Sequence, residues 1–79
     1  MNRPYSVQAE WDQNAEVWVA TSDDVRGLVI EARTVEALST KLESLVLELL
    51  EANGYLPAEG EVAFELLARR IGVVRPSTA

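Results

Sequence analysis

The N-terminal part of the chain alternates between apolar and polar positions. Over residues 5–11, YSVQAEW, Val7 and Ala9 are separated by polar neighbours, and a period of two is typical of a strand with one buried face. The polar residues 12–15, DQNA, favour a turn, and a β-forming run over 16–21 follows. The pattern therefore predicts a hairpin with strands at about 5–11 and 16–21.

The length of the hairpin loop decides which face of the second strand is buried. An even number of loop residues pairs Ala9 with Trp18, and because directly paired residues share a face, Trp18 would then join Ala9 in the core. An odd number would bury Val17 and Val19 instead. We favour the even loop, which places Trp18 inside.

A third strand and a long helix follow the hairpin. Gly27 ends an acidic turn, where glycine adopts a positive φ at low cost, and residues 28–32, LVIEA, predict a third strand in an antiparallel meander. The apolar residues then recur three and four positions apart, as in an amphipathic helix. Thr34 is a suitable N-cap and Asn53-Gly54 a suitable end, so we expect a helix over about 35–53.

The last third of the sequence gives a weaker pattern. Residues 55–60, YLPAEG, are typical of a loop. Residues 61–70 alternate like a strand but are rich in Glu, Ala and Leu, which favour helix, so both structures remain open on pattern alone. Residues 75–79 resemble a frayed tail. We therefore expect one α+β domain over 1–79, with a single helix covering one face of an antiparallel sheet.

The amino-acid composition excludes several kinds of covalent, catalytic and metal-binding site. The 79 residues include no cysteine and no histidine, which excludes disulfides, thiol or imidazole nucleophiles and ordinary zinc sites. Thirteen acidic and seven basic residues give a net charge of −6, which argues against direct nucleic-acid binding and fits attraction to a basic partner. No signal peptide or apolar membrane span is evident, so we expect a cytoplasmic protein without membrane association and without a cofactor.

The adjacent carboxylates Asp23 and Asp24 are the clearest candidates for metal chemistry. A shared site with Asp12 would have to bridge the two ends of the second strand, about 20 Å apart at ~3.3 Å per residue. Asp is moreover a common turn residue. We therefore interpret Asp23-Asp24 as a turn first and a charged handle for a partner second. We expect no metal site, no catalytic residues and no enzymatic activity.

The uncovered face of the sheet is the expected partner-binding surface. One helix can cover only one face, and the other would present valines among acidic and small polar residues, a composition suited to a protein partner. Together with the acidic turn, the candidate partner-binding residues are Glu10, Val17, Val19, Asp23, Asp24, Val29 and Glu31.

From Tyr5 to Gly54 the chain resembles the HicB-like antitoxins, especially a small subfamily long catalogued as a domain of unknown function. The matching positions are Trp18 in the strand, Asp24 in the turn, Gly27 after it, and the helix start Thr34-Val35-Glu36-Ala37-Leu38. The resemblance implies a partial ribonuclease-H-like fold of order β-β-β-α-β, with a last strand at about 62–69. It also implies that the protein neutralises a small basic, mRNA-cleaving toxin of the HicA type in a type II toxin-antitoxin system.

The sequence departs from the HicB pattern in two ways. Asp23 and Arg26 stand where the turn usually carries prolines, which changes the charge at a possible toxin contact. No helix-turn-helix or ribbon-helix-helix module follows the domain, so we expect no operator binding by this chain alone. The competing interpretation is an orphan homo-oligomeric domain with a regulatory or structural role, and a dimer is compatible with either.

Overall fold

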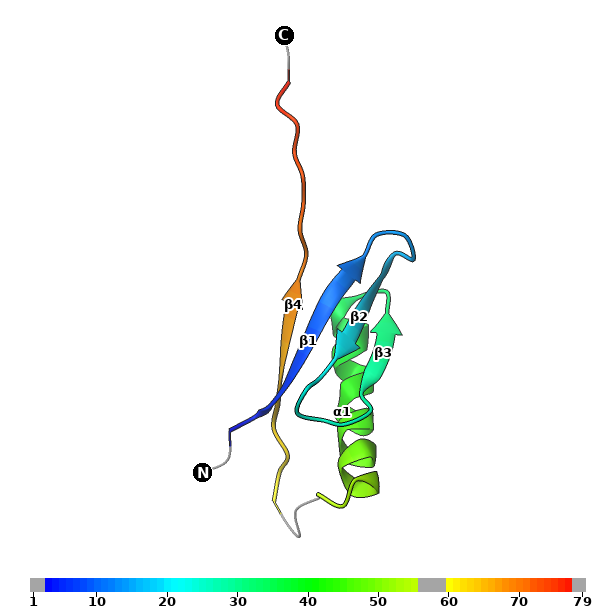
Figure 1. The fold of residues 1–79 in the computed structure, drawn as a ribbon, viewed down its shortest axis with the longest axis vertical. Coiled ribbons are helices and arrows are strands. Elements are labelled where there is room, and N and C mark those ends of the chain that lie inside the picture. The colour runs from blue at the N-terminus through cyan, green and yellow to red at the C-terminus, as the bar shows by residue number, and fades with distance from the viewer. Residues whose placement is uncertain (1–2, 56–59, 78–79) are drawn as a thin grey trace.

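The fold is a four-stranded sheet with one helix packed on one face (Figure 1). The computed structural model describes residues 3–55 and 60–77. Along the chain the elements are β1 (Tyr5–Asp12), β2 (Val17–Thr21), β3 (Val29–Ala32), α1 (Val35–Ala52) and β4 (Phe64–Arg69). The predicted order β-β-β-α-β and the α+β class are confirmed. Of the expected 55–60 loop, residues 56–59 lie outside the described residues.

The sheet is mixed, with strand order β3-β2-β1-β4. β1, β2 and β3 form the expected antiparallel meander, but β4 pairs parallel to β1, so the sheet is not antiparallel throughout. β4 is parallel to β1 because of the connection between β3 and β4. β3 runs in the direction of β1, α1 returns the chain in the opposite direction, and β4 then runs the same way as β3 and β1. The strand alternative for residues 61–70 is the one observed, beginning at Phe64 rather than near residue 62.

The hairpin between β1 and β2 has the predicted parity but a different register. Asp12 pairs with Val17, which leaves an even loop of residues 13–16, and Trp18 pairs with Trp11 rather than with Ala9. The turn starts one residue later than the polar pattern suggested because the Asp12 carboxylate accepts hydrogen bonds from the backbone N–H groups of residues 14 and 15. Trp18 therefore faces the helix, as expected from an even loop.

Helix α1 begins and ends where its capping residues predict. The Thr34 hydroxyl accepts a hydrogen bond of 3.0 Å from the Ala37 N–H, which satisfies one of the unpaired donors of the first turn. The backbone N–H of Asn53 closes the last turn on the Leu49 carbonyl at 2.9 Å. The buried stripe of the helix consists of Leu38, Leu42, Val46 and Leu50.

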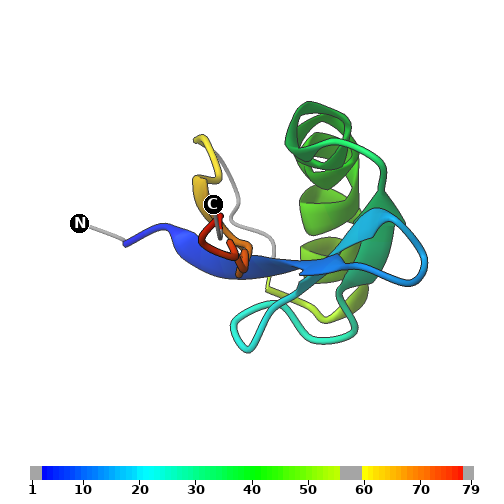
Figure 2. The ribbon, with the colours of Figure 1, turned by 90° about the horizontal axis from the view of Figure 1, so that it is seen from above.

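The core is concentrated between α1 and the meander. Viewed from above, α1 lies over the β2–β3 side of the sheet, while β4 lies on the far side of β1 (Figure 2). The fully buried residues under the helix include Val7 and Ala20, and the β2–β3 turn adds Val25 and Leu28, with 0% and 2% of their surface exposed. Burial of a turn valine was not visible in the alternating pattern.

Candidate partner-binding surface

The face of the sheet opposite α1 carries most of the predicted partner-binding residues. The pairing register places Glu10 beside Val19, and Val19 beside Glu31, so two carboxylates flank a valine across three strands. Thr21 pairs with Val29 in the neighbouring row, and Val17 lies on the same face two residues before Val19. Five of the seven predicted residues therefore share one surface, which we call the open face.

Strand β4 extends the open face with residues that sequence reasoning missed. Arg69 pairs with Glu10, and Leu67 pairs with Gln8. Two apolar side chains of this face project strongly into solvent, since Val29 is 68% and Leu67 54% exposed, whereas Val17 and Val19 are half-buried. The position of β4 beside β1 could not be foreseen from sequence alternation, which specifies a strand but not its neighbour.

The structure separates the two aspartates of the β2–β3 turn. Asp24 is half-buried, and its carboxylate accepts a hydrogen bond of 2.7 Å from the Ser6 backbone N–H. The Ser22 hydroxyl accepts hydrogen bonds from the N–H groups of Asp24 and Val25 and donates to the Ser6 carbonyl. These bonds hold the turn against the first residues of β1, so Asp24 has a structural role in the fold.

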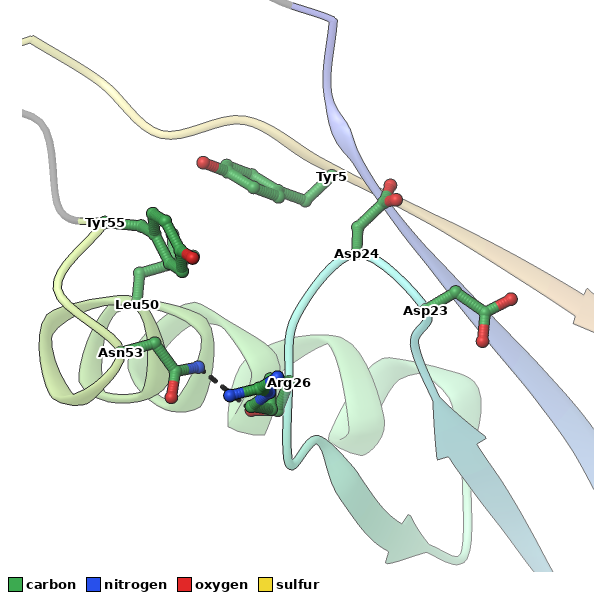
Figure 3. A pocket seen from close by; sticks show the side chains of 7 residues that line it. All are labelled: Tyr5, Asp23, Asp24, Arg26, Leu50, Asn53 and Tyr55. Carbon is green, nitrogen blue, oxygen red and sulfur yellow. Dashed lines mark hydrogen bonds between the residues drawn. The ribbon is translucent and has the colours of Figure 1, made fainter.

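Asp23 is the exposed carboxylate of the pair and borders a surface hollow of about 330 Å³. Figure 3 shows the hollow between the turn, the start of β1 and the end of α1, with both carboxylates pointing away from the helix. Its lining residues are Tyr5, Asp23, Asp24, Arg26, Leu50, Asn53 and Tyr55. The Asn53 side-chain amide donates a hydrogen bond of 3.1 Å to the Arg26 carbonyl and so fixes the turn to the helix end.

The turn requires glycine at one position. Gly27 has φ +86°, and the Leu28 N–H donates back to the Val25 carbonyl at 3.2 Å. A left-handed residue here lets the chain reverse while Val25 and Leu28 both point into the core. The predicted glycine and turn are therefore present, although the turn is anchored by more side-chain bonds than the sequence suggested.

The carboxylates do not converge. Asp12 lies beside the start of β2, whereas Asp23 and Asp24 follow its other end. Within residues 3–55 and 60–77, no three Asp, Glu, His or Cys side chains are placed to share a metal ion.

An aromatic cluster at the far end of β1 was not anticipated. The rings of Trp11 and Trp18 meet edge to face, with centroids 5.6 Å apart, and the guanidinium of Arg70 lies 4.4 Å from the centre of the Trp11 ring. Both contacts are attractive, because the edge of one aromatic ring favours the face of another and a cation favours the face of an aromatic ring. Arg70 is the first residue after β4, so the cluster contacts the chain where it leaves that strand.

Known proteins place the chain in a family but give it no activity. Residues 4–75 match the model of DUF1902, described as a domain of unknown function. The solved structure of hypothetical protein TTHA1013 from the extremely thermophilic bacterium Thermus thermophilus is 51% identical, with a TM-score of 0.78, over 91% of this chain and all of that one. No curated protein matches the chain. No helix of the described residues is long and apolar enough to cross a bilayer.

Proposed function

We propose that this chain, which belongs to the DUF1902 family of domains of unknown function, is an antitoxin-like binding module that sequesters a small basic toxin. The HicB-like resemblance of its first two thirds, noted from the sequence, supplies the class of partner: a HicA-type protein that cleaves mRNA in the cytoplasm. The chain acts by occupying the toxin's RNA-binding surface and performs no reaction of its own.

The observation that carries the proposal is the row Glu10–Val19–Glu31 across the open face. A protein that binds RNA presents Lys and Arg to phosphates, and two carboxylates on a rigid sheet offer those side chains an alternative partner. Val19 between them, with Val29 exposed in the next row, supplies the apolar centre that a stable interface needs. In the proposed interface, Glu10 and Glu31 would belong to the charged rim, and Val19 and Val29 to the apolar centre.

The acidic turn contributes charge through Asp23. Its carboxylate is exposed and free to meet a basic side chain, whereas the Asp24 carboxylate already binds the Ser6 N–H. Charges at the rim of an interface mainly set the association rate and its dependence on salt. Asp23→Asn should therefore slow association and reduce the salt dependence while changing dissociation little.

The decisive experiment co-expresses the chain with a small basic protein of the HicA type, where one is encoded in an adjacent reading frame. We expect the two proteins to co-purify, and we expect the chain to inhibit RNA cleavage by that protein in a stoichiometric titration. A Val19→Asp variant should lose inhibition mainly through faster dissociation, because it puts a charge at the apolar centre. Its circular dichroism and melting temperature show whether the isolated fold is intact.

The competing orphan interpretation predicts the opposite result. If the chain neither co-purifies with nor inhibits a basic neighbour, the antitoxin proposal fails. If Val19→Asp leaves inhibition intact, the partner binds elsewhere than the open face. A direct test of purified chain with Mg²⁺ or Mn²⁺ on single-stranded RNA, DNA and an RNA–DNA hybrid should show no cleavage.

A further inference from the structure

The segment after β4 projects away from the body of the protein. Residues 70–77 continue in the direction of β4 beyond the end of the sheet (Figure 1). They stretch the molecule to 64 Å along its longest axis and give a radius of gyration of 15.7 Å, against about 12 Å expected for a compact domain of this length. We call residues 70–77 the arm.

The arm carries three apolar side chains that are mostly exposed to solvent in the single chain. Ile71 is 78%, Val73 87% and Val74 92% exposed. Exposed apolar residues clustered within four positions are a recurrent sign of a protein interface. An extended chain also offers unpaired backbone groups, which another strand can satisfy.

Strand β4 presents the complementary surface. It is the last strand in the sheet order, so among the described residues its outer edge has no hydrogen-bonded neighbour. Beside its start lies a groove of about 370 Å³ between the helix and the chain entering β4, with Val46, Leu47, Val62 and Phe64 as its apolar lining. Glu43 and Glu61 lie at the same groove and are exposed.

The charge of the arm identifies its partner. The arm contains two of the seven basic residues, Arg70 and Arg75, and none of the thirteen acidic ones, which leaves thirteen acids against five bases in the rest of the chain. A basic toxin would repel such an arm. A second copy of this chain would attract it, because its groove carries Glu43 and Glu61.

We propose that two copies of the chain form a symmetric dimer in which each arm pairs antiparallel with the outer edge of the other copy's β4. The arm cannot reach its own groove, because Val74 lies ten residues beyond Phe64 and ~3.3 Å per residue separates them along a strand. A twofold axis near residues 68–70 brings the arm of each copy to the start of the other's β4. Both copies then gain the same contacts, as an isologous interface requires.

The pairing also matches the faces of the sheet. Side chains alternate along an extended strand, so Val74 lies on the side of Phe64, next to the groove, and Ile71 lies on the side of Leu67. Directly paired antiparallel residues share a face. Val74 of one copy therefore contacts the groove of the other, and Ile71 covers the apolar surface around Leu67, which is 54% exposed in the single chain.

Sedimentation equilibrium of the purified chain tests the proposal. We expect a mass twice the 8.7 kDa of one chain. The double variant Val73→Asp/Val74→Asp should raise the dimer dissociation constant at least about tenfold, equivalent to ~1.4 kcal/mol, with an unchanged circular dichroism spectrum. Ser77→Asn, which changes the same arm outside its apolar positions without adding charge, is the control and should remain dimeric.

The absence of native cysteine makes the geometry testable. Single cysteines placed at Ala68, Arg69 and Arg70 should form an intermolecular disulfide at the residue on the axis, because only that residue meets its own copy at bonding distance. A cysteine at Val19 should not. A monomer at high micromolar concentration, a dimer unaffected by Val73→Asp/Val74→Asp, or cross-linking through Val19 alone would each overturn the proposal.

The dimer proposal and the antitoxin proposal can fail independently of each other. A monomeric arm variant that still inhibits the basic neighbour would show that toxin binding does not require the dimer. Loss of dimerisation in Val19→Asp, with the arm variant unaffected, would instead assign self-association to the open face and refute the arm-mediated dimer.

Discussion

The two ends of the sheet differ in how fully they are packed. On the β2–β3 side, α1 covers the strands, and the turn between them buries Val25 and Leu28 almost completely. On the β4 side, Leu67 is 54% exposed, and beyond the strand Ile71 is 78% exposed. One helix cannot cover four strands, so the chain completes its core on one side and leaves apolar surface on the other, where a partner can contribute.

The largest expected effect is on the packed side. Leu42 is fully buried in the stripe of α1, and replacing it with alanine removes that packing and leaves a cavity. Leu42→Ala should lower the free energy of unfolding by about 2–5 kcal/mol, measured by urea denaturation. Leu47→Ala, at a position of the same helix that is 45% exposed, is the control and should cost much less. Equal losses would show that the helix packs differently.

A smaller effect is expected at the turn that joins β2 to β3. Asp24→Asn removes the charge from the hydrogen bond that its carboxylate accepts from Ser6. Hydrogen bonds to charged groups contribute about 1.5–3 kcal/mol, and the loss should lie at or below this range because the asparagine oxygen still accepts. Asp23→Asn should change stability by less than about 0.5 kcal/mol, as for ordinary surface substitutions. A larger loss at Asp23 would contradict the separation of the two aspartates.

A comparable loss of stability is expected from a change of backbone conformation at Gly27 in the same turn. Gly27 has φ +86°, and a Cβ placed there would lie 3.7 Å from Leu49 Cδ2, an ordinary contact. Gly27→Ala should therefore cost about 1–2 kcal/mol through backbone strain and not through collision. Gly72→Ala in the arm, where an added Cβ would meet nothing within 4 Å, is the matched control. Thermal denaturation of both variants at one protein concentration compares them.

The packed side of the molecule was largely predictable from the sequence. The helix bounds followed from Thr34 and Asn53, because capping residues act locally, and the facing of Trp18 followed from loop parity. The pairing register of β1 and β2 could not be predicted in the same way, because hydrogen bonds to the Asp12 side chain place the turn one residue later along the chain. The structural role of Asp24 was also hidden, because its partner Ser6 is eighteen residues away.

The β4 side was much less predictable. Alternation in residues 61–70 allowed a strand, but pairing with β1 depends on where the helix returns the chain, which is a property of the whole topology. Arg69 and Leu67 therefore joined the open face only once the sheet order was known. The five open-face residues chosen from sequence share one surface because strand parity alone determines that feature. Whether they bind a partner stays a prediction.

The most direct test of the central claim measures binding of the small basic neighbour to two double variants by surface plasmon resonance. Val19→Asp/Val29→Asp alters the open face, and Val73→Asp/Val74→Asp alters the arm. We predict much faster dissociation for the open-face variant. The arm variant should dissociate at a rate close to that of the unmodified chain when these two are measured as monomers. Unchanged dissociation of the open-face variant, with its fold intact, would contradict the claim that this face is the toxin-binding surface.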